Sequence, residues 1–140
     1  MLRNTKIWTG QCHCGAVRFE TTLTDGLNSA LRCNCSYCLM RGAVVVLAPT
    51  GIKFLKGKDE LVSYRFHSRS VEHFFCSHCG IYTHHQRRSD QSKLGVNVAC
   101  LDGISPFDFE DLPVVDGANH PKDTGKPSRL AGHLRFIPSQ

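Results

Sequence analysis

The sequence of 140 residues predicts a mainly β protein, and three observations lead to that fold class. Apolar and polar side chains alternate along several short segments, which is the period of a half-buried strand. A short run rich in β-branched residues, at 44–47, fits a buried strand better than a helix. Helix signals occur in one short segment only, at 36–41.

The first predicted strand covers 17–23, where Val17, Phe19, Thr21 and Leu23 share one face. The predicted helix follows at 36–41. Ser36 can cap its N-terminus, and Gly42 can end it after one or two turns. Further strands are predicted over 44–47, 62–66, 71–75, 81–85, 94–100 and 133–137.

The composition changes after Gly103. Five of the six prolines lie beyond that point, together with four acidic residues from Asp108 to Asp116. We therefore expect residues 104–140 to form a loop-rich tail that contains only the last of the predicted strands. The total length fits a single domain, 1–140.

Membrane and secreted classes are disfavoured by the sequence. The longest wholly apolar run, 43–48, has six residues, far fewer than a membrane-spanning helix needs. The first ten residues lack the apolar stretch of a signal peptide. We expect a cytoplasmic protein, and in a reducing compartment eight cysteines favour metal binding over disulfides.

The formal charge of +5 suggests a nucleic-acid partner, but its distribution does not support one. Residues 1–93 hold 13 basic and 6 acidic side chains, residues 94–140 hold 4 and 6, and no dense basic arm is present. A zinc ion on four thiolates has a net charge of −2, and one on three thiolates −1, which together would reduce +5 to about +2. Nucleic acid is therefore not expected as the main partner.

Two pairs of cysteines have the spacing of a structural zinc site. They are Cys12-x-Cys14 and Cys76-x-x-Cys79, and each pair is followed by a glycine that supports a tight turn. Joining them closes a loop of 61 residues, at a cost of roughly 4 kcal/mol in chain entropy. Zinc binding by four such ligands contributes on the order of 10–16 kcal/mol, so we expect one structural ion on these four cysteines.

The middle group, Cys33, Cys35 and Cys38, lies within six residues and has no local fourth cysteine. Three protein ligands and an open position are typical of reactive zinc. Such an ion can accept a thiol and lower its pKa, which yields the nucleophile for a reaction with a carbonyl group. Alternatively, the group is a second closed structural site, completed by a histidine or by Cys100.

Other readings of these residues remain open. Cys76-x-x-Cys79 also matches a redox dithiol, although that leaves the other groups unexplained. Cys100 is expected to pack as a small buried side chain. His13 and His78 are expected at the surface of the cysteine turns. His84 and His85 lie on opposite faces of a predicted strand, so at most one can face a site, and Arg87-Arg88 either bind substrate carboxylates or are solvated.

Taken in order, these motifs resemble the glutathione-dependent formaldehyde-activating enzyme family, which includes the centromere protein V-like domain. The resemblance runs from about Thr9 to Gly103 and is carried by Cys-x-Cys-Gly-Ala-Val-Arg-Phe, Cys-x-Cys-x-x-Cys, Phe-Cys-x-x-Cys-Gly and Leu-Asp-Gly. It implies a β-tent fold of antiparallel sheets with two zinc ions per chain. The structural ion would lie on Cys12, Cys14, Cys76 and Cys79, and the catalytic ion on Cys33, Cys35 and Cys38.

The family resemblance also implies an activity, namely that of a carbon–sulfur lyase. Glutathione and formaldehyde would combine to S-hydroxymethylglutathione, with the thiol bound to zinc as a thiolate. The same site could take a related thiol or another small aldehyde. Because glutathione carries two carboxylates, Arg41 and the pair Arg87-Arg88 are candidates to bind them.

Two other function classes compete with this interpretation. In the first, both zinc ions are structural and the protein is a non-catalytic module that binds protein or nucleic acid. In the second, the chain is a redox or methionine-sulfoxide-reducing protein, which requires a reactive cysteine outside the zinc groups. Cys100 is the only such cysteine, and no partner is placed to resolve it.

Overall fold

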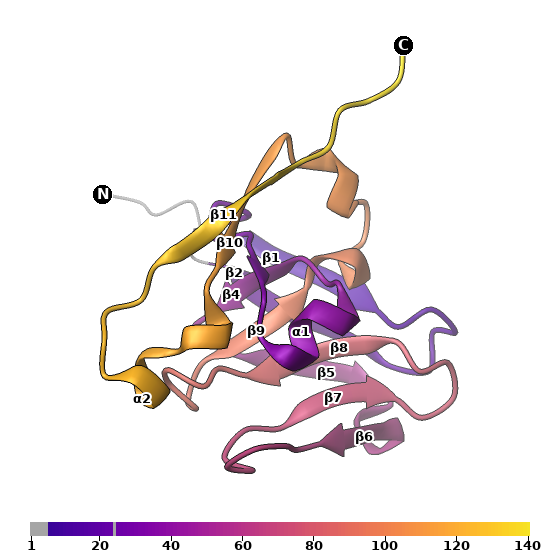
Figure 1. The fold of residues 1–140 in the computed structure, drawn as a ribbon. Coiled ribbons are helices and arrows are strands. Elements are labelled where there is room, and N and C mark those ends of the chain that lie inside the picture. Colours follow the sequence, from indigo (N-terminus) through magenta and orange to yellow (C-terminus); the bar gives the residue numbers. More distant parts are fainter. Residues whose placement is uncertain (1–5, 24) are drawn as a thin grey trace, which may run out of the picture.

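The computed structural model describes residues 6–23 and 25–140 and confirms the mainly β class. Its strands form three sheets (Figure 1). The first sheet has the order β1-β2-β5, the second β4-β9-β8-β7-β6, and the third β11-β10-β3. The strands are β1 (Lys6–Gln11), β2 (Arg18–Leu23), β3 (Arg32–Cys33), β4 (Val45–Ala48), β5 (Ile52–Lys56), β6 (Leu61–Tyr64), β7 (His73–Cys76), β8 (Tyr82–Gln86), β9 (Leu94–Asn97), β10 (Asp111–Val115) and β11 (Leu130–Arg135).

The strand pairs are antiparallel with one exception among the described residues, because β3 and β10 run parallel. The helical elements are short. They are α1 (Ser36–Arg41) and α2 (Pro121–Thr124), with 3₁₀ turns at Lys58–Glu60, Val98–Cys100, Pro106–Asp108 and Gly117–Asn119. No helix in the described part of the chain is long and apolar enough to cross a membrane.

The main hydrophobic core joins the first sheet to β4 and β9. Phe19 and Leu23 of β2 are fully buried, as the alternation of this strand predicts, and they belong to the same core cluster as Val46 and Val96. A second, smaller cluster contains the buried Cys12 and the buried Cys76. Cys76 is the last residue of β7. Cysteines therefore share this small core with apolar residues such as Val17, where the first two sheets meet.

Several predicted boundaries are wrong. The strand expected over 94–100 ends at Asn97, because the Asn97 side chain accepts a hydrogen bond from the amide of Ala99 at 3.1 Å and caps a 3₁₀ turn. The strand expected over 62–66 ends at Tyr64, and the one expected over 133–137 is β11.

Residues 104–140 contain more regular structure than the predicted loops and single strand. They hold β10, β11, two 3₁₀ turns and α2. In Figure 1 the hairpin of β10 and β11 lies at the opposite end of the molecule from β6 and β7, and the chain passes from β10 through α2 beside the middle of the fold. The parallel pairing of β10 with β3 brings this tail to the middle cysteine group.

Candidate functional site

The outer four cysteines converge, as their spacing predicts. The Sγ atoms of Cys12, Cys14, Cys76 and Cys79 all lie within 4.8 Å of one another. The Sγ atom of Cys14 is 3.7 Å from that of Cys12 and 3.7 Å from that of Cys76. Tetrahedral zinc with bonds of about 2.3 Å separates its sulfur ligands by about 3.8 Å, so the donor set fits such an ion.

The backbone around this outer group supports ligand binding. Gly15 and Gly80 have φ values of +80° and +75°, the left-handed conformation expected of the turn glycines. The amide of Val17 donates a hydrogen bond to the Cys12 sulfur at 3.3 Å. His13 is exposed, and the His78 ring contacts Glu60 at 2.6 Å, so both histidines lie on the surface as predicted.

The middle group forms where β3 leads into α1. Cys33 ends β3, Cys35 precedes α1, and Cys38 lies in the first turn of the helix, with the three Sγ atoms within 4.8 Å. Cys35, rather than the predicted Ser36, is the N-cap, because its sulfur accepts the amide of Cys38 at 3.4 Å. Gly42 ends the helix in the left-handed conformation, which confirms its predicted role.

The electrostatics of the middle group suit a cation. Hydrogen bonds from the thiols of Cys33 and Cys38 lower the pKa of Cys35, while the Cys33 and Cys35 sulfurs raise the pKa of Cys38. Cys35 therefore readily becomes a thiolate, whereas Cys38 can lose its proton as well only when a positive charge lies between the sulfurs. Three thiolates around zinc meet that requirement.

No fourth ligand joins this group within the part of the chain that the structure describes. The metal-type cluster contains three cysteines and no histidine or carboxylate. Cys100 is 5% exposed and donates its S–H to the carbonyl of Tyr82 at 3.4 Å, which matches the predicted packing role. The middle group thus provides three protein ligands and leaves the fourth coordination position of a metal ion to a bound small molecule.

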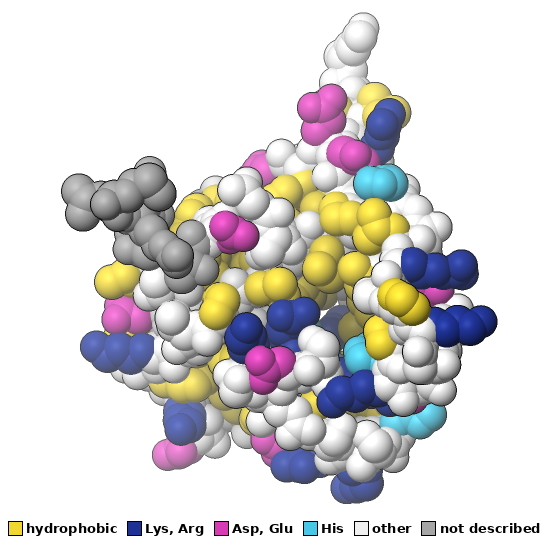
Figure 2. Space-filling model, turned by 90° about the vertical axis from the view of Figure 1, so that its left-hand side faces the viewer, with side chains coloured by type: hydrophobic (Ala, Val, Ile, Leu, Met, Phe, Trp, Pro, Cys, Tyr) yellow, Lys and Arg dark blue, Asp and Glu magenta, His cyan; other side chains and the backbone are white. Residues whose placement is uncertain are grey.

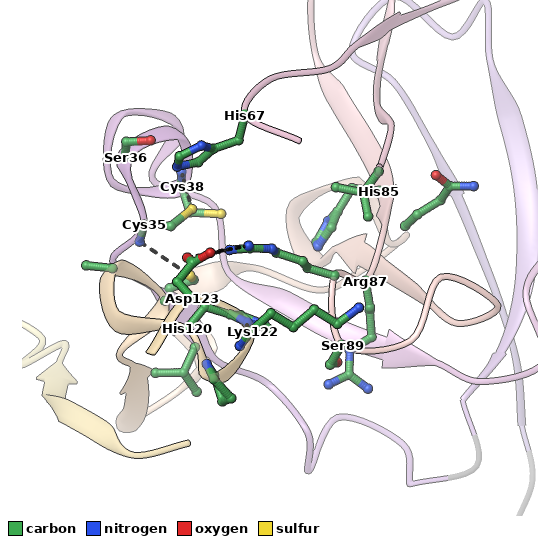
Figure 3. A pocket seen from close by; sticks show the side chains of 18 of the residues that line it. Cys35, Ser36, Cys38, His67, His85, Arg87, Ser89, His120, Lys122 and Asp123 are labelled. Atoms are coloured by element: carbon green, nitrogen blue, oxygen red, sulfur yellow. Dashed lines mark hydrogen bonds and ion pairs between the residues drawn. The ribbon is translucent and has the colours of Figure 1, made fainter. Parts of the chain in front are cut away.

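A cavity of about 670 Å³ lies against the middle group, and all three of its cysteines line the wall. Figure 2 shows basic and histidine side chains around a hollow on this face. In Figure 3, Cys35 and Cys38 lie on one side and His85 and Arg87 on the other, with residues of the tail between them. The lining side chains that carry a charge or an imidazole are His67, His73, His85, Arg87, Arg88, Asp116, His120, Lys122 and Asp123.

The tail holds the middle group in place, which sequence analysis did not predict. The amide of Asn34, between Cys33 and Cys35, donates to the carbonyl of Val115 at 3.3 Å. The Asn34 side chain donates to Asp116 at 3.2 Å and accepts the amide of Ala118 at 3.0 Å. These contacts join positions more than 80 residues apart, so no local pattern could indicate them.

Asp116 is the anchor of this junction. Its side chain is 4% exposed. Hydrogen bonds from Asn119, Arg129 and Asn34 hold the pKa of this carboxyl below its usual range. The stability that these contacts contribute is therefore fully present when the pH is above the ordinary pKa of a carboxyl group. It is lost as the pH falls through the lowered pKa that Asp116 has in the folded state.

Arg41 does not line the cavity, so its expected role in carboxylate binding is not supported. Its guanidinium lies 3.6 Å from the ring centroid of Tyr82 and 4.8 Å from that of Tyr37. One nitrogen donates to the Cys38 sulfur at 3.3 Å, and another is 3.1 Å from Nδ1 of His73. Arg41 is thus half-buried against the middle group, where its charge counteracts the rise in the pKa of Cys38 and favours a thiolate.

His84 and His85 lie on opposite faces of β8, as predicted. His84 is buried and stacks on Phe74 with a centroid separation of 4.5 Å. His85 lines the cavity, and its Nδ1 is 2.6 Å from the hydroxyl of Tyr82. His73, which the sequence analysis did not single out, lines the same cavity.

The remaining basic residues differ in how they are paired. Arg88 donates to Asp123 across the cavity at 2.8 Å, so its charge is compensated. Among the described residues, Arg87 and Lys122 have no ion-pair partner. These two side chains are the cavity cations available to an anionic ligand.

Comparison with known proteins adds two findings. The profile of the glutathione-dependent formaldehyde-activating enzyme family matches residues 7–111. A Rhodobacter sphaeroides protein of known crystal structure is 46% identical, with a TM-score of 0.73 over 76% of this chain and 98% of that protein. The tail residues that complete the cavity wall, from Asp116 to Asp123, lie beyond the family match.

Proposed function

The chain belongs to the glutathione-dependent formaldehyde-activating enzyme family, and from this premise we propose that it joins glutathione, or a related thiol, to formaldehyde or another small aldehyde. The product is an S-hydroxymethyl adduct, and the activity is that of a carbon–sulfur lyase acting in the direction of synthesis. The observation that carries the proposal is the group of three cysteines that opens onto a cavity without a fourth protein ligand.

The two cysteine groups have different roles in this proposal. Cys12, Cys14, Cys76 and Cys79 would hold a structural zinc ion, and Cys33, Cys35 and Cys38 a catalytic one. When bound to the three cysteines, zinc would lower the pKa of a substrate thiol so that it is a thiolate near neutral pH. The hydrogen bond from Arg41 to Cys38 supports the same site by stabilising negative charge on the sulfur.

Substrate recognition is assigned to the cavity wall. Arg87 and Lys122 supply two uncompensated positive charges, which is the complement required by the two carboxylates of glutathione. A cavity of about 670 Å³ lies within the usual range for small-molecule sites. Residues 1–140 act as one zinc-binding domain in this proposal, and the eight free cysteines fit a reducing, cytoplasmic location.

Substitution of Cys35 tests the function. Cys35→Ser is expected to bind one zinc ion fewer per chain than the wild type and to lose glutathione binding, while the chain remains folded. Cys100→Ser is the matched control, because it removes a cysteine outside both groups and keeps a hydroxyl that can donate to Tyr82. Zinc per chain by elemental analysis and glutathione binding by calorimetry are the measurements. Glutathione affinity that is equal in Cys35→Ser and the wild type would contradict the proposal.

A further inference from the structure

A pair of imidazole rings faces the middle cysteine group across the cavity. His73 of β7 and His85 of β8 are directly opposite each other in the strand register. Their rings are stacked, with centroids 5.1 Å apart and planes at 14°. Both residues line the same cavity as the three cysteines.

The position of the ring proton of His73 follows from its neighbour. Nδ1 of His73 is 3.1 Å from a guanidinium nitrogen of Arg41. A guanidinium can only donate hydrogen bonds, so Nδ1 must accept, and the proton of the neutral ring is on Nε2. The same guanidinium donates to Cys38 at 3.3 Å, so a single side chain links the ring to the cysteine group.

The same reasoning applies to His85. Its Nδ1 is 2.6 Å from the hydroxyl of Tyr82, a residue that is 7% exposed. That hydroxyl has no other hydrogen-bond partner in the described part of the chain, and a buried hydroxyl proton requires an acceptor. Tyr82 therefore donates to Nδ1, and the proton of His85 is on Nε2. Gly95 leaves the space for the ring, because a Cβ atom there would lie 2.5 Å from Cε1 of His85.

Both rings are held neutral by their surroundings. Burial, together with the positive charge of the adjacent Arg41, lowers the pKa of His73 to about 4. Burial likewise lowers the pKa of His85 well below its usual value. A neutral imidazole with Nδ1 occupied can only act as a donor through Nε2. The ring edge of His85 points into the cavity (Figure 3).

We propose that His73 and His85 form a site for the carbonyl oxygen of the aldehyde, to which their two Nε2–H groups donate hydrogen bonds. The inference rests on the proposed function and adds to it the residues that act on the second substrate. The substrate sulfur attacks the carbonyl carbon and forms the C–S bond, while the π electron pair of the carbonyl moves to oxygen. The resulting alkoxide takes a proton from water, and both rings remain neutral. Preorganised donors of this kind stabilise the developing charge on oxygen.

Nitrogen NMR of the zinc-loaded wild-type protein tests the proton positions without any substitution. Two-bond ¹H–¹⁵N spectra are expected to show His73 and His85 with the proton on Nε2. In Tyr82→Phe, His85 loses its fixed donor and is expected to populate both tautomers, while His73 is unchanged. A wild-type spectrum with the proton on Nδ1 of either ring would overturn the inference.

Kinetics test the role of the donors. His85→Leu is expected to reduce kcat for adduct formation from glutathione and ¹³C-formaldehyde by about 100- to 1000-fold and to leave the Kd for glutathione unchanged. His85→Gln retains an N–H donor and is expected to recover part of the loss. His133→Gln on β11, which does not line the cavity, is the matched histidine control and is expected to match the wild type.

The outcomes separate this inference from the proposed function. If the wild type does not accelerate adduct formation, the proposed function fails and the inference fails with it. If the wild type is active and folded His85→Leu keeps full kcat, the proposed function stands and the inference is overturned. If His85→Leu does not fold, the rates of His85→Gln and Tyr82→Phe decide, and the inference requires both to lie below the wild type.

Discussion

Gly117 shapes the middle cysteine group through the side chain that it lacks. A Cβ atom at this position would overlap the Cys33 sulfur and lie 3.2 Å from Cβ of Cys35. The backbone of the tail can therefore approach Cys33 and Cys35 this closely only because residue 117 is a glycine. Glycine is required at position 117 for lack of space and not for its backbone conformation, because Gly117 is not among the glycines with a positive φ.

Gly117→Ala is expected to displace the sulfur of Cys33 and to lower the zinc content by about one ion per chain, with the outer site still loaded. Elemental analysis gives the zinc content, and circular dichroism shows whether the fold is kept. Gly132→Ala is the matched control, because nothing lies within 4 Å of a Cβ atom at that position. Equal zinc content in both variants and the wild type would show that the tail does not restrict the middle group.

At the residue scale, the sequence indicates site residues that are close together in the chain and does not indicate those that meet only in the folded structure. The seven clustered cysteines could be grouped from the sequence because each motif lies within a few residues and each needs ligands for one ion. Asn34 and Asp116 could not be found, because an amide and a carboxylate 82 positions apart have no local signature. His73 was missed for a similar reason, since its partner Arg41 reaches it from another element.

At the scale of elements, β2 connects the first sheet to the main core. Phe19, Thr21 and Leu23 of this strand are buried while the residues between them are half-buried. Phe19 is 0% exposed, and its ring lies directly under the backbone of Gly10 in β1. The close packing of the two strands at Gly10 therefore depends on this ring.

Phe19→Ala is expected to lower the free energy of unfolding by about 3–5 kcal/mol, because it removes a fully buried ring and leaves a cavity. Ile7→Ala on the neighbouring strand is the control, since Ile7 is 62% exposed, and a change within about 0.5 kcal/mol is expected. Urea unfolding followed by fluorescence measures both. A similar loss in the two variants would contradict the placement of the core.

The sequence predicted elements best where one side of a strand is buried. The alternation in 17–23 located β2 because polar and apolar residues separate cleanly there. β10 was not predicted, since Pro113 and the acidic residues around it are typical of loops. The pairing of β10 with β3 and β11 outweighs these local preferences, as tertiary contacts often do. The end of β9 at Asn97 was missed because apolar residues continue on both sides of it, although asparagine itself is disfavoured within strands.

At the scale of the whole molecule, the outer four cysteines join the first sheet to the second. Cys12 and Cys14 follow β1, whereas Cys76 is the last residue of β7 and Cys79 lies in the turn before β8. A zinc ion on these ligands contributes on the order of 10–16 kcal/mol. Because a domain is typically stable by only about 5–15 kcal/mol, the fold as a whole is expected to depend on this ion.

Cys76→Ser is therefore expected to leave the chain largely unfolded at 25 °C, in contrast to Cys35→Ser, which keeps the outer site. Far-UV circular dichroism and zinc content of the two variants give the comparison. The two substitutions are matched in chemistry and differ only in the group that they disrupt. A folded Cys76→Ser chain with the thermal midpoint of the wild type would show that the outer site does not determine stability.

The contact between Gly117 and the Cys33 sulfur has a consequence for the order of assembly during synthesis. The outer ligand set is complete once Cys79 has been made, whereas the wall beside Cys33 arrives with residue 117. About 80 residues separate that wall from Cys38, which corresponds to roughly 4–16 seconds of translation. During that interval the three sulfurs of the nascent chain are already present but not yet enclosed, which gives metal delivery a defined time window.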